Sequence, residues 1–351
     1  MTSTGNRVAW VLGAGFSKSL GGPLLVDMFS KRTQEESRHR FKSLDPTSHN
    51  ELYEFYRKHQ RPERGHVLWG DAEEFLDYAD TAREDGHRQK VLKELGQDVV
   101  RLHTQCIASL AAETSFASGV SLSSEAWQPY LTWARTLTRN DSIITFNYDL
   151  VLERLGEDQT VRNLGPETVF DIEESAVPGS AAIIYKLHGS VDWLVPMDGS
   201  KKILRAAEPQ KMLESPARIL IASPGPAKRL RRDEVLNRIW DQAKLDLKAA
   251  DTIVFLGYRF PPSDSMARSE LFEAIKAKTG GHLKIHIVLG PNTSHPDNVR
   301  LASMLDVILK DAGRERTHTR NGSVNASYNI VQQPLYVEDF FTVLNPTFLQ
   351  Y

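Results

Sequence analysis

VAWVLGAGFS, residues 8–17, places an uninterrupted apolar run directly before a glycine-rich turn. An apolar run without polar alternation is typical of a strand buried on both faces, as in parallel sheets. Glycines after such a strand let the backbone turn tightly and bring its N–H groups near a phosphate, at the start of a helix. This stretch therefore predicts a strand, a turn and a helix that bind a nucleotide, with an ordinary glycine turn as the alternative.

Further short apolar runs alternate with amphipathic stretches along the chain. The other strand candidates are 142–146, 182–187, 218–222, 252–256 and 283–289, and the helical candidates include 71–81, 88–109, 233–248 and 263–278. Strands that alternate with helices predict an α/β fold with a Rossmann-like, doubly wound, mostly parallel sheet. Residues 31–134 show helical pattern and few strand candidates, so we expect a helical insertion or subdomain there, within one domain spanning residues 1–351.

Composition narrows the class of protein. The chain has 351 residues, of which 40% are hydrophobic, so it can bury a sizeable core. Its formal net charge of -2 excludes a polycation that attracts nucleic acid or acidic membranes as a whole. Cys106 is the only cysteine, which excludes a zinc site built from several thiolates, and we expect no bound metal. The run at 8–12 is too short to cross a membrane, so we expect a cytoplasmic protein with no membrane contact.

Two familiar phosphate-binding loops do not fit the first motif. A Walker loop has a glycine immediately before its Lys-Ser pair, whereas Ser17 precedes Lys18-Ser19 here. A dehydrogenase of the Rossmann type would have a third glycine at the position of Lys18. A nucleoside triphosphatase and a simple dehydrogenase are therefore disfavoured.

Two polar motifs close other predicted strands. TFNYD, residues 145–149, supplies Asn147, which can position a ribose or a water, and Asp149, which adds an acceptor or caps the next helix. KLHGS, residues 186–190, supplies His188, whose pKa range suits a general base, and the glycine after it leaves the imidazole face open. A turn role for Asn147 and a buried structural role for His188 remain the alternatives.

Two later motifs follow the next predicted strands. GYRFPPSD, residues 257–264, begins with a glycine that can admit a dinucleotide, and Ser263 or Asp264 can cap the following helix. Asn292 in the sequence GPN can form the adenosine-ribose edge of the same crevice. Because ligands of open α/β sheets bind at the carboxyl ends of the strands, we expect all these motifs to meet there.

Together, in this order, GAGFS with Gly22-Pro23, TFNYD, KLHGS and GYRFPPSD resemble the sirtuin superfamily, in particular the sirtuin-like domains of bacterial anti-phage defence proteins. The resemblance runs from Gly13 to Asp264. It implies that Asn147 and His188 are catalytic, with Asp149 in support. It also implies an NAD site made by Gly13, Ala14, Gly15, Phe16, Ser17, Pro23, Thr145, Gly257, Tyr258 and Asn292.

One departure from the family shapes the functional expectation. Deacylases of the family carry a four-cysteine zinc module, which the single Cys106 cannot supply. The resemblance therefore implies an NAD glycohydrolase that yields nicotinamide and ADP-ribose and depletes NAD during phage infection. The alternatives are an NAD- or ADP-ribose-binding regulatory module without turnover, and a deacylase or ADP-ribosyltransferase. Hydrolysis is not distinguished from cyclisation. Because constant activity would be toxic, we expect control by homo-oligomerisation or by a partner such as a DNA translocase, an argonaute-like protein or a phage component.

Overall fold

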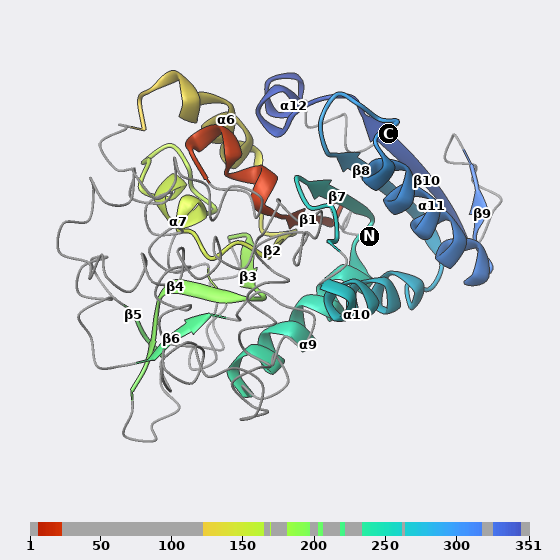
Figure 1. Ribbon diagram of the computed structural model, residues 1–351, viewed down its shortest axis with the longest axis horizontal. Coiled ribbons are helices and arrows are strands. Elements are labelled where there is room, and N and C mark those ends of the chain that lie inside the picture. Colours follow the sequence, from red (N-terminus) through yellow and green to blue (C-terminus); the bar gives the residue numbers. More distant parts are fainter. Residues whose placement is uncertain are drawn as a thin grey trace, which may run out of the picture.

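Seven parallel strands form the main sheet of the computed structural model. The structure describes residues 6–22, 122–164, 169, 181–196, 203–205, 218–221, 234–261, 264–317 and 326–344. The strand order is β3-β2-β1-β7-β8-β10-β9 (Figure 1). The strands are β1 (Val8–Leu12), β2 (Asp141–Thr145), β3 (Ile183–Lys186), β7 (Thr252–Leu256), β8 (Gly281–Val288), β9 (Glu315–Arg316) and β10 (Ala326–Gln333). The predicted α/β fold with a parallel sheet is confirmed.

The sheet reverses its winding direction at β1. From β1 the chain first adds β2 and then β3 on one side, and later adds β7, β8 and β10 on the other. β1 therefore pairs in parallel with both β2 and β7, and every residue of all three strands is buried. Such a reversal opens a crevice at the carboxyl ends of the strands, which is where open α/β sheets bind ligands.

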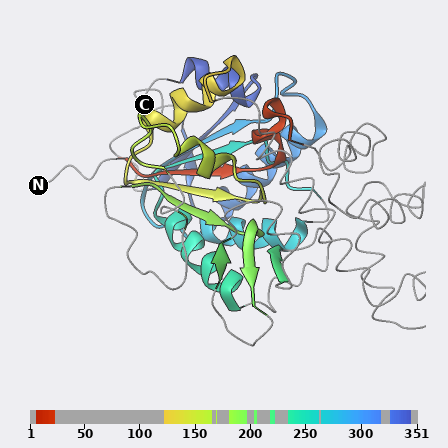
Figure 2. The ribbon, with the colours of Figure 1, turned by 90° about the vertical axis from the view of Figure 1, so that its left-hand side faces the viewer.

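Helices cover both faces of the sheet (Figure 2). On one face lie α6 (Gln128–Thr136) and α12 (Val337–Val343), with α7 (Val151–Leu155) in contact with α6; on the other lie α9 (Glu234–Ala249), α10 (Ser265–Lys276) and α11 (Pro296–Asp311). In α9 the buried residues are Leu236, Ile239, Trp240, Ala243 and Leu247. This spacing of three and four residues is the stripe expected of a helix that packs on one side.

A second, antiparallel sheet stands beside the first. It has the order β5-β4-β6 and consists of β4 (Gly189–Val195), β5 (Leu204–Arg205) and β6 (Arg218–Ile221). The strand predicted at 218–222 therefore exists but belongs to this sheet. Neither β4 nor β10 was predicted, because polar residues interrupt both strands. The helices predicted at 233–248 and 263–278 are confirmed within two residues at each end.

Part of the predicted helical insertion lies outside the described residues. Of residues 31–134, only the end is described: a 3-10 helix, η5 (Glu125–Trp127), and most of α6, which packs against α12. The helices predicted at 71–81 and 88–109 lie outside that part of the chain. No helix among the described residues is both long and apolar enough to cross a membrane.

Candidate functional site

The predicted motifs converge at the carboxyl ends of β1, β2, β3 and β7. Gly13 follows β1 directly, Asn147 lies two residues after β2, His188 lies two residues after β3, and Gly257 follows β7 directly. Parallel register brings these positions to one edge of the sheet, since Leu12 pairs with both Thr145 and Leu256. The expectation that the strand-end motifs share one edge is confirmed.

The glycine loop differs from the predicted phosphate-binding turn. The N–H of Gly13 donates to the Leu256 carbonyl at 3.0 Å, that of Gly15 to the Gly257 carbonyl at 3.1 Å, and that of Phe16 to the Gly13 carbonyl at 2.8 Å. Two single-turn 3-10 helices, η1 (Ala14–Phe16) and η2 (Lys18–Leu20), stand where one helix was expected. All three N–H groups therefore bind protein carbonyls in this conformation, and those of Gly13 and Gly15 hold the loop after β1 against the end of β7 and the loop after it.

Close backbone approach explains two of the glycines. A Cβ on Gly15 would lie 2.7 Å from the Gly257 Cα, and a Cβ on Gly257 would lie 2.5 Å from the Gly15 carbonyl carbon. Gly257 also has φ of +64°, a conformation that favours glycine. Packing between the two loops is therefore sufficient reason for these glycines, whatever ligand binds nearby.

Asn147 links the end of β2 to the glycine loop. Its Nδ2 donates to the Gly13 carbonyl oxygen and to Ser17 Oγ, both at 3.1 Å, and its backbone N–H donates to Thr145 Oγ1 at 3.1 Å. Because a side-chain amide carries two hydrogens, both are used in these contacts. Towards a ligand, Asn147 can therefore act as an acceptor through Oδ1, for example from a ribose hydroxyl or a water.

Asp149 is held in place by contacts that serve both the loop and a helix. Ser17 Oγ donates to its Oδ2 at 2.6 Å, and the Val151 N–H donates to its Oδ1 at 3.2 Å at the first turn of α7. Burial raises the pKa of the Asp149 carboxyl, while the hydrogen bond from Ser17 and the charge of Lys186 act in the opposite direction. Asp149 is not the N-cap residue of α7, which is Leu150, but its carboxylate accepts from the first N–H of that helix and also contacts the glycine loop.

His188 lies in a buried aromatic surrounding at the turn between β3 and β4. Only 3% of its surface is exposed, with the Phe146 ring edge-on at 4.9 Å and the Tyr148 ring stacked at 6.0 Å. Gly189 after it has φ of +79°, and a Cβ there would lie 2.0 Å from the Leu220 carbonyl oxygen of β6. The close approach of β6 is therefore the reason for Gly189, and the expectation that this glycine leaves the imidazole face open is wrong, since His188 is buried with the rings of Phe146 and Tyr148 against it.

The loop after β7 packs an aromatic ring against the segment that follows β2. The Tyr258 ring stacks on Phe146 at 4.0 Å with an interplanar angle of 12°, and its hydroxyl donates to Asp264 Oδ2 at 2.8 Å. Asp264 stands at the N-cap position of α10, but its side chain makes no capping hydrogen bond. The predicted cap is therefore wrong for Asp264, because the carboxylate accepts from Tyr258 instead. The other predicted cap, Ser263, lies outside the described residues.

The remaining predicted positions are less central. Asn292 is exposed in the loop after β8, two strands from β1, and its Oδ1 accepts from the Ser294 N–H at 3.1 Å. Phe16 points into the core, where its ring meets those of Tyr130 and Trp133 at 5.3 and 5.6 Å. Pro23 and Cys106 lie outside the described residues. Within the described part, no group of three or more His, Cys, Asp or Glu side chains is arranged to hold a metal ion.

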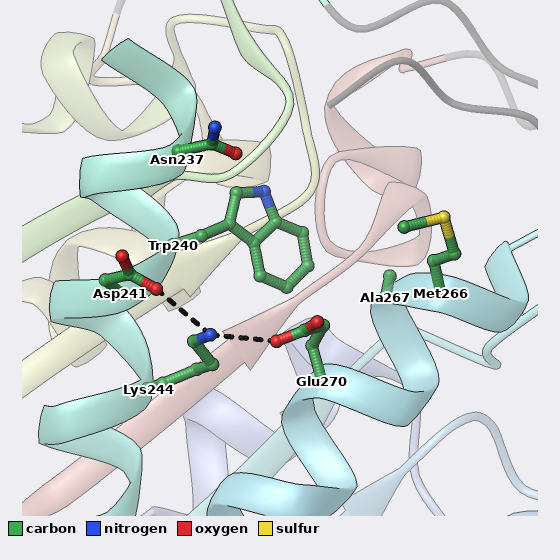
Figure 3. A pocket seen from close by; sticks show the side chains of 7 residues that line it. All are labelled: Asn237, Trp240, Asp241, Lys244, Met266, Ala267 and Glu270. Atoms are coloured by element: carbon green, nitrogen blue, oxygen red, sulfur yellow. Dashed lines mark hydrogen bonds and ion pairs between the residues drawn. The ribbon is translucent and has the colours of Figure 1, made fainter. Parts of the chain in front are cut away.

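A cavity of about 390 Å³ opens between α9 and α10, with Trp240 in its lining (Figure 3). Lys244 lies in it between Asp241 and Glu270, at 3.1 and 2.8 Å. The Trp240 indole N–H donates to the Leu187 carbonyl at 2.9 Å, and its ring lies 6.0 Å from Phe146. The cavity therefore borders on the His188 turn through one side chain, although none of the predicted site residues lines it.

Sequence reasoning missed two residues that hold the site together. Lys186 is 1% exposed and donates hydrogen bonds beneath the Asn147–Asp149 turn and the His188 turn. Tyr130 of α6 donates from its hydroxyl to the Phe16 carbonyl at 2.6 Å. A lysine inside the apolar run AIIYKL was the available signal for Lys186, because a lysine is rarely buried without partners.

The family model of the SIR2-like domain matches residues 141–308, a little under half of the chain, and this part includes Asn147, His188 and Gly257. No curated protein gives a significant match.

Solved structures of Sir2 homologues are similar at low identity. A mutant in complex with 2'-O-acetyl ADP ribose is 13% identical, with a TM-score of 0.42, over 87% of this chain and 92% of its own. A Sir2 homologue in complex with NAD is 12% identical, with a TM-score of 0.41, over 87% and 90% of the two chains.

Proposed function

We propose that this protein is an NAD glycohydrolase that cleaves the nicotinamide–ribose bond to give nicotinamide and ADP-ribose. The observation that carries the proposal is that Asn147 and His188 follow the neighbouring strands β2 and β3 at the carboxyl edge of the sheet, inside the segment that matches the SIR2-like domain. One side chain is an oriented amide and the other a potential base, and both lie where an open α/β sheet binds a nucleotide.

The proposed reaction is hydrolysis of the nicotinamide–ribose bond. Water supplies the hydroxyl that replaces nicotinamide at the ribose carbon, through a transition state with oxocarbenium character. The imidazole of His188 accepts the proton from that water or from a ribose hydroxyl. Asn147 Oδ1 accepts from the same water or from the ribose, since both Nδ2 hydrogens already hold the glycine loop.

Nicotinamide release from NAD tests the proposal directly. Wild type should release nicotinamide and ADP-ribose, whereas folded His188→Ala and Asn147→Ala should be slower by about two to four orders of magnitude. His282→Ala is the matched control, because this histidine lies near the opposite end of the sheet, at the second residue of β8, where its Nδ1 contacts Ser327 Oγ at 2.8 Å. It should keep wild-type activity.

The other outcomes separate the alternatives. Undiminished release by both folded variants would refute the assigned roles. Tight NAD binding without release by wild type would favour a regulatory binding module, and a cyclic product resolved by chromatography would identify a cyclase. Transfer to a protein would appear as a modified acceptor only when one is added.

We also propose that the activity serves bacterial anti-phage defence by depleting NAD, with control by oligomerisation or by a separate partner. Support comes from the sequence resemblance and from the toxicity that unregulated NAD cleavage would cause. Size-exclusion chromatography with light scattering, run beside the activity assay, tests the control. A strictly monomeric protein that is active without any partner would contradict it.

A further inference from the structure

Lys186 is a buried cation at the last position of β3. Its Nζ donates to the Asp149 carbonyl oxygen at 2.6 Å, to Glu153 Oε1 at 2.7 Å and to Ser190 Oγ at 2.8 Å. An ammonium group has three hydrogens, so all of them are directed at these acceptors. The contacts join the turn after β2, the helix α7 and the strand β4 to the end of β3.

Two of these acceptors flank the residues proposed to act on NAD. Asp149 lies two residues after Asn147, and Ser190 lies two residues after His188. Short charge-assisted hydrogen bonds to both fix how far apart the two turns can move. Lys186 itself is enclosed, with 1% of its surface exposed.

Stability alone does not account for this arrangement. Burial raises the pKa of the Glu153 carboxyl, an effect that the charge of Lys186 opposes and that of Asp192 reinforces. Removing two charges from water costs several kcal/mol per ion, and apolar replacements of such pairs are often neutral or stabilising. Folding energy therefore does not explain the buried Lys186–Glu153 ion pair. The hydrogen bonds of Lys186 to both turns indicate a role in holding those turns together.

We propose that Lys186 is a positioning residue, which holds the Asn147 turn and the His188 turn in the mutual geometry that NAD cleavage requires. The catalytic consequence rests on the proposed function, whereas the clamp between the two turns does not. A shift of about 1 Å in a positioned group can cost on the order of a hundredfold in rate.

Three variants separate positioning from support of the fold. Lys186→Met keeps the length of the side chain but leaves Glu153 as an unpaired buried charge, so it should lower the melting temperature. Lys186→Met combined with Glu153→Gln removes both charges and should recover most of that loss. Glu153→Gln alone leaves Lys186 with its contacts to Asp149 and Ser190, and its amide oxygen can still accept.

Positioning predicts that the double variant recovers stability but not function. We expect its kcat for nicotinamide release to stay about tenfold to a hundredfold below wild type, with KM changed less, and amide hydrogen exchange at 146–151 and 187–191 to be faster than in wild type. Glu153→Gln should keep kcat within about threefold, with wild-type exchange. A double variant with wild-type stability, exchange and kcat would overturn the proposal.

The two readouts also separate this inference from the proposed function. If isolated wild type releases no nicotinamide, the protein is a binding module or an enzyme that awaits its partner, while hydrogen exchange still decides whether Lys186 holds the two turns. If the double variant does not fold, Ser190→Ala is the milder substitution, because it removes only the acceptor on β4. Faster exchange at 187–191 in that variant, at an unchanged melting temperature, supports the clamp, and unchanged exchange contradicts it.

Discussion

At the scale of single residues, Gly15 and Gly257 show how closely two loops approach. Their backbones meet at distances that leave no room for a Cβ on either side. Gly281 has nearly the same φ as Gly257, +65° against +64°, but a Cβ there would meet nothing within 4 Å. Gly257 and Gly281 therefore both adopt a left-handed backbone conformation that favours glycine, but only Gly257 also lacks room for a Cβ.

Alanine substitutions at these two positions should differ in cost. Gly281→Ala should lower the free energy of unfolding by about 1 to 2 kcal/mol, the cost of a left-handed conformation in a residue with a Cβ. Gly257→Ala should lose about 1 to 3 kcal/mol more, because the new methyl group forces the two loops apart. Urea denaturation measures both values. Equal losses would mean that the loops separate without strain.

At the scale of elements, α6 holds the glycine loop after β1 through a side-chain hydrogen bond. The Tyr130 hydroxyl donates to the Phe16 carbonyl, so Ser19 Oγ, at 2.6 Å, donates to Tyr130 in turn. Phe341 of α12 stacks on Trp133 at 5.0 Å and meets Tyr130 edge-on at 5.4 Å. The loop after β1 is thus anchored on a pair of packed helices, α6 and α12.

Tyr130→Phe should separate loop support from general stability. The variant leaves the Phe16 carbonyl without its donor and should lose about 1 to 2 kcal/mol of unfolding free energy. Tyr185→Phe is the matched control, since its hydroxyl donates to Asp246 Oδ2 at 2.7 Å, away from the loop. Both should lose similar stability in urea titrations, whereas only Tyr130→Phe should weaken NAD binding, by about threefold to tenfold, in calorimetry. Equal NAD affinity in the two variants would argue against loop support by α6.

At the scale of the whole molecule, a histidine inside the sheet makes folding depend on pH. His286 of β8 is 1% exposed, and burial, with a smaller effect of the Lys284 charge, lowers its pKa to about 3 from the ordinary 6.5. Its Nδ1 accepts from Gln333 Nε2 on β10 at 3.0 Å, which suits the neutral ring. Between pH 6.5 and about 3 the unfolded chain therefore binds a proton that the folded protein does not.

This difference gives the direction of the pH dependence. As the pH falls below 6.5, His286 should contribute a loss of about 1.4 kcal/mol of stability per pH unit. Above pH 6.5 the residue is neutral in both states and contributes no slope. Replacing it by leucine should reduce the slope of unfolding free energy between pH 6 and 5 by about that amount. Urea denaturation of both proteins at these pH values measures the slope, and parallel curves would show that His286 is protonated in the fold.

Much of the fold could be predicted because its signals are local. β1 and β7 were predicted with their observed bounds, and α9 within one residue, from uninterrupted apolar runs and a helical spacing of apolar side chains. β10 was missed because it begins ASYN and ends VQQ, so only part of it carries an apolar pattern. The strand at 218–221 was found but its sheet was not, since a periodicity of side chains does not name a pairing partner.

The sequence by itself determined the parallel α/β class and the strand-end positions of Asn147, His188 and Gly257. Only the tertiary structure decided the strand order, the second sheet and the residues that hold the site, such as Lys186 and Tyr130. The physical reason is distance along the chain: Asn147 meets Gly13 across 134 residues, and Tyr130 meets Phe16 across 114. Residue pattern encodes which face of an element is buried, whereas hydrogen bonds and steric contacts between remote segments exist only once the sheet has brought them together.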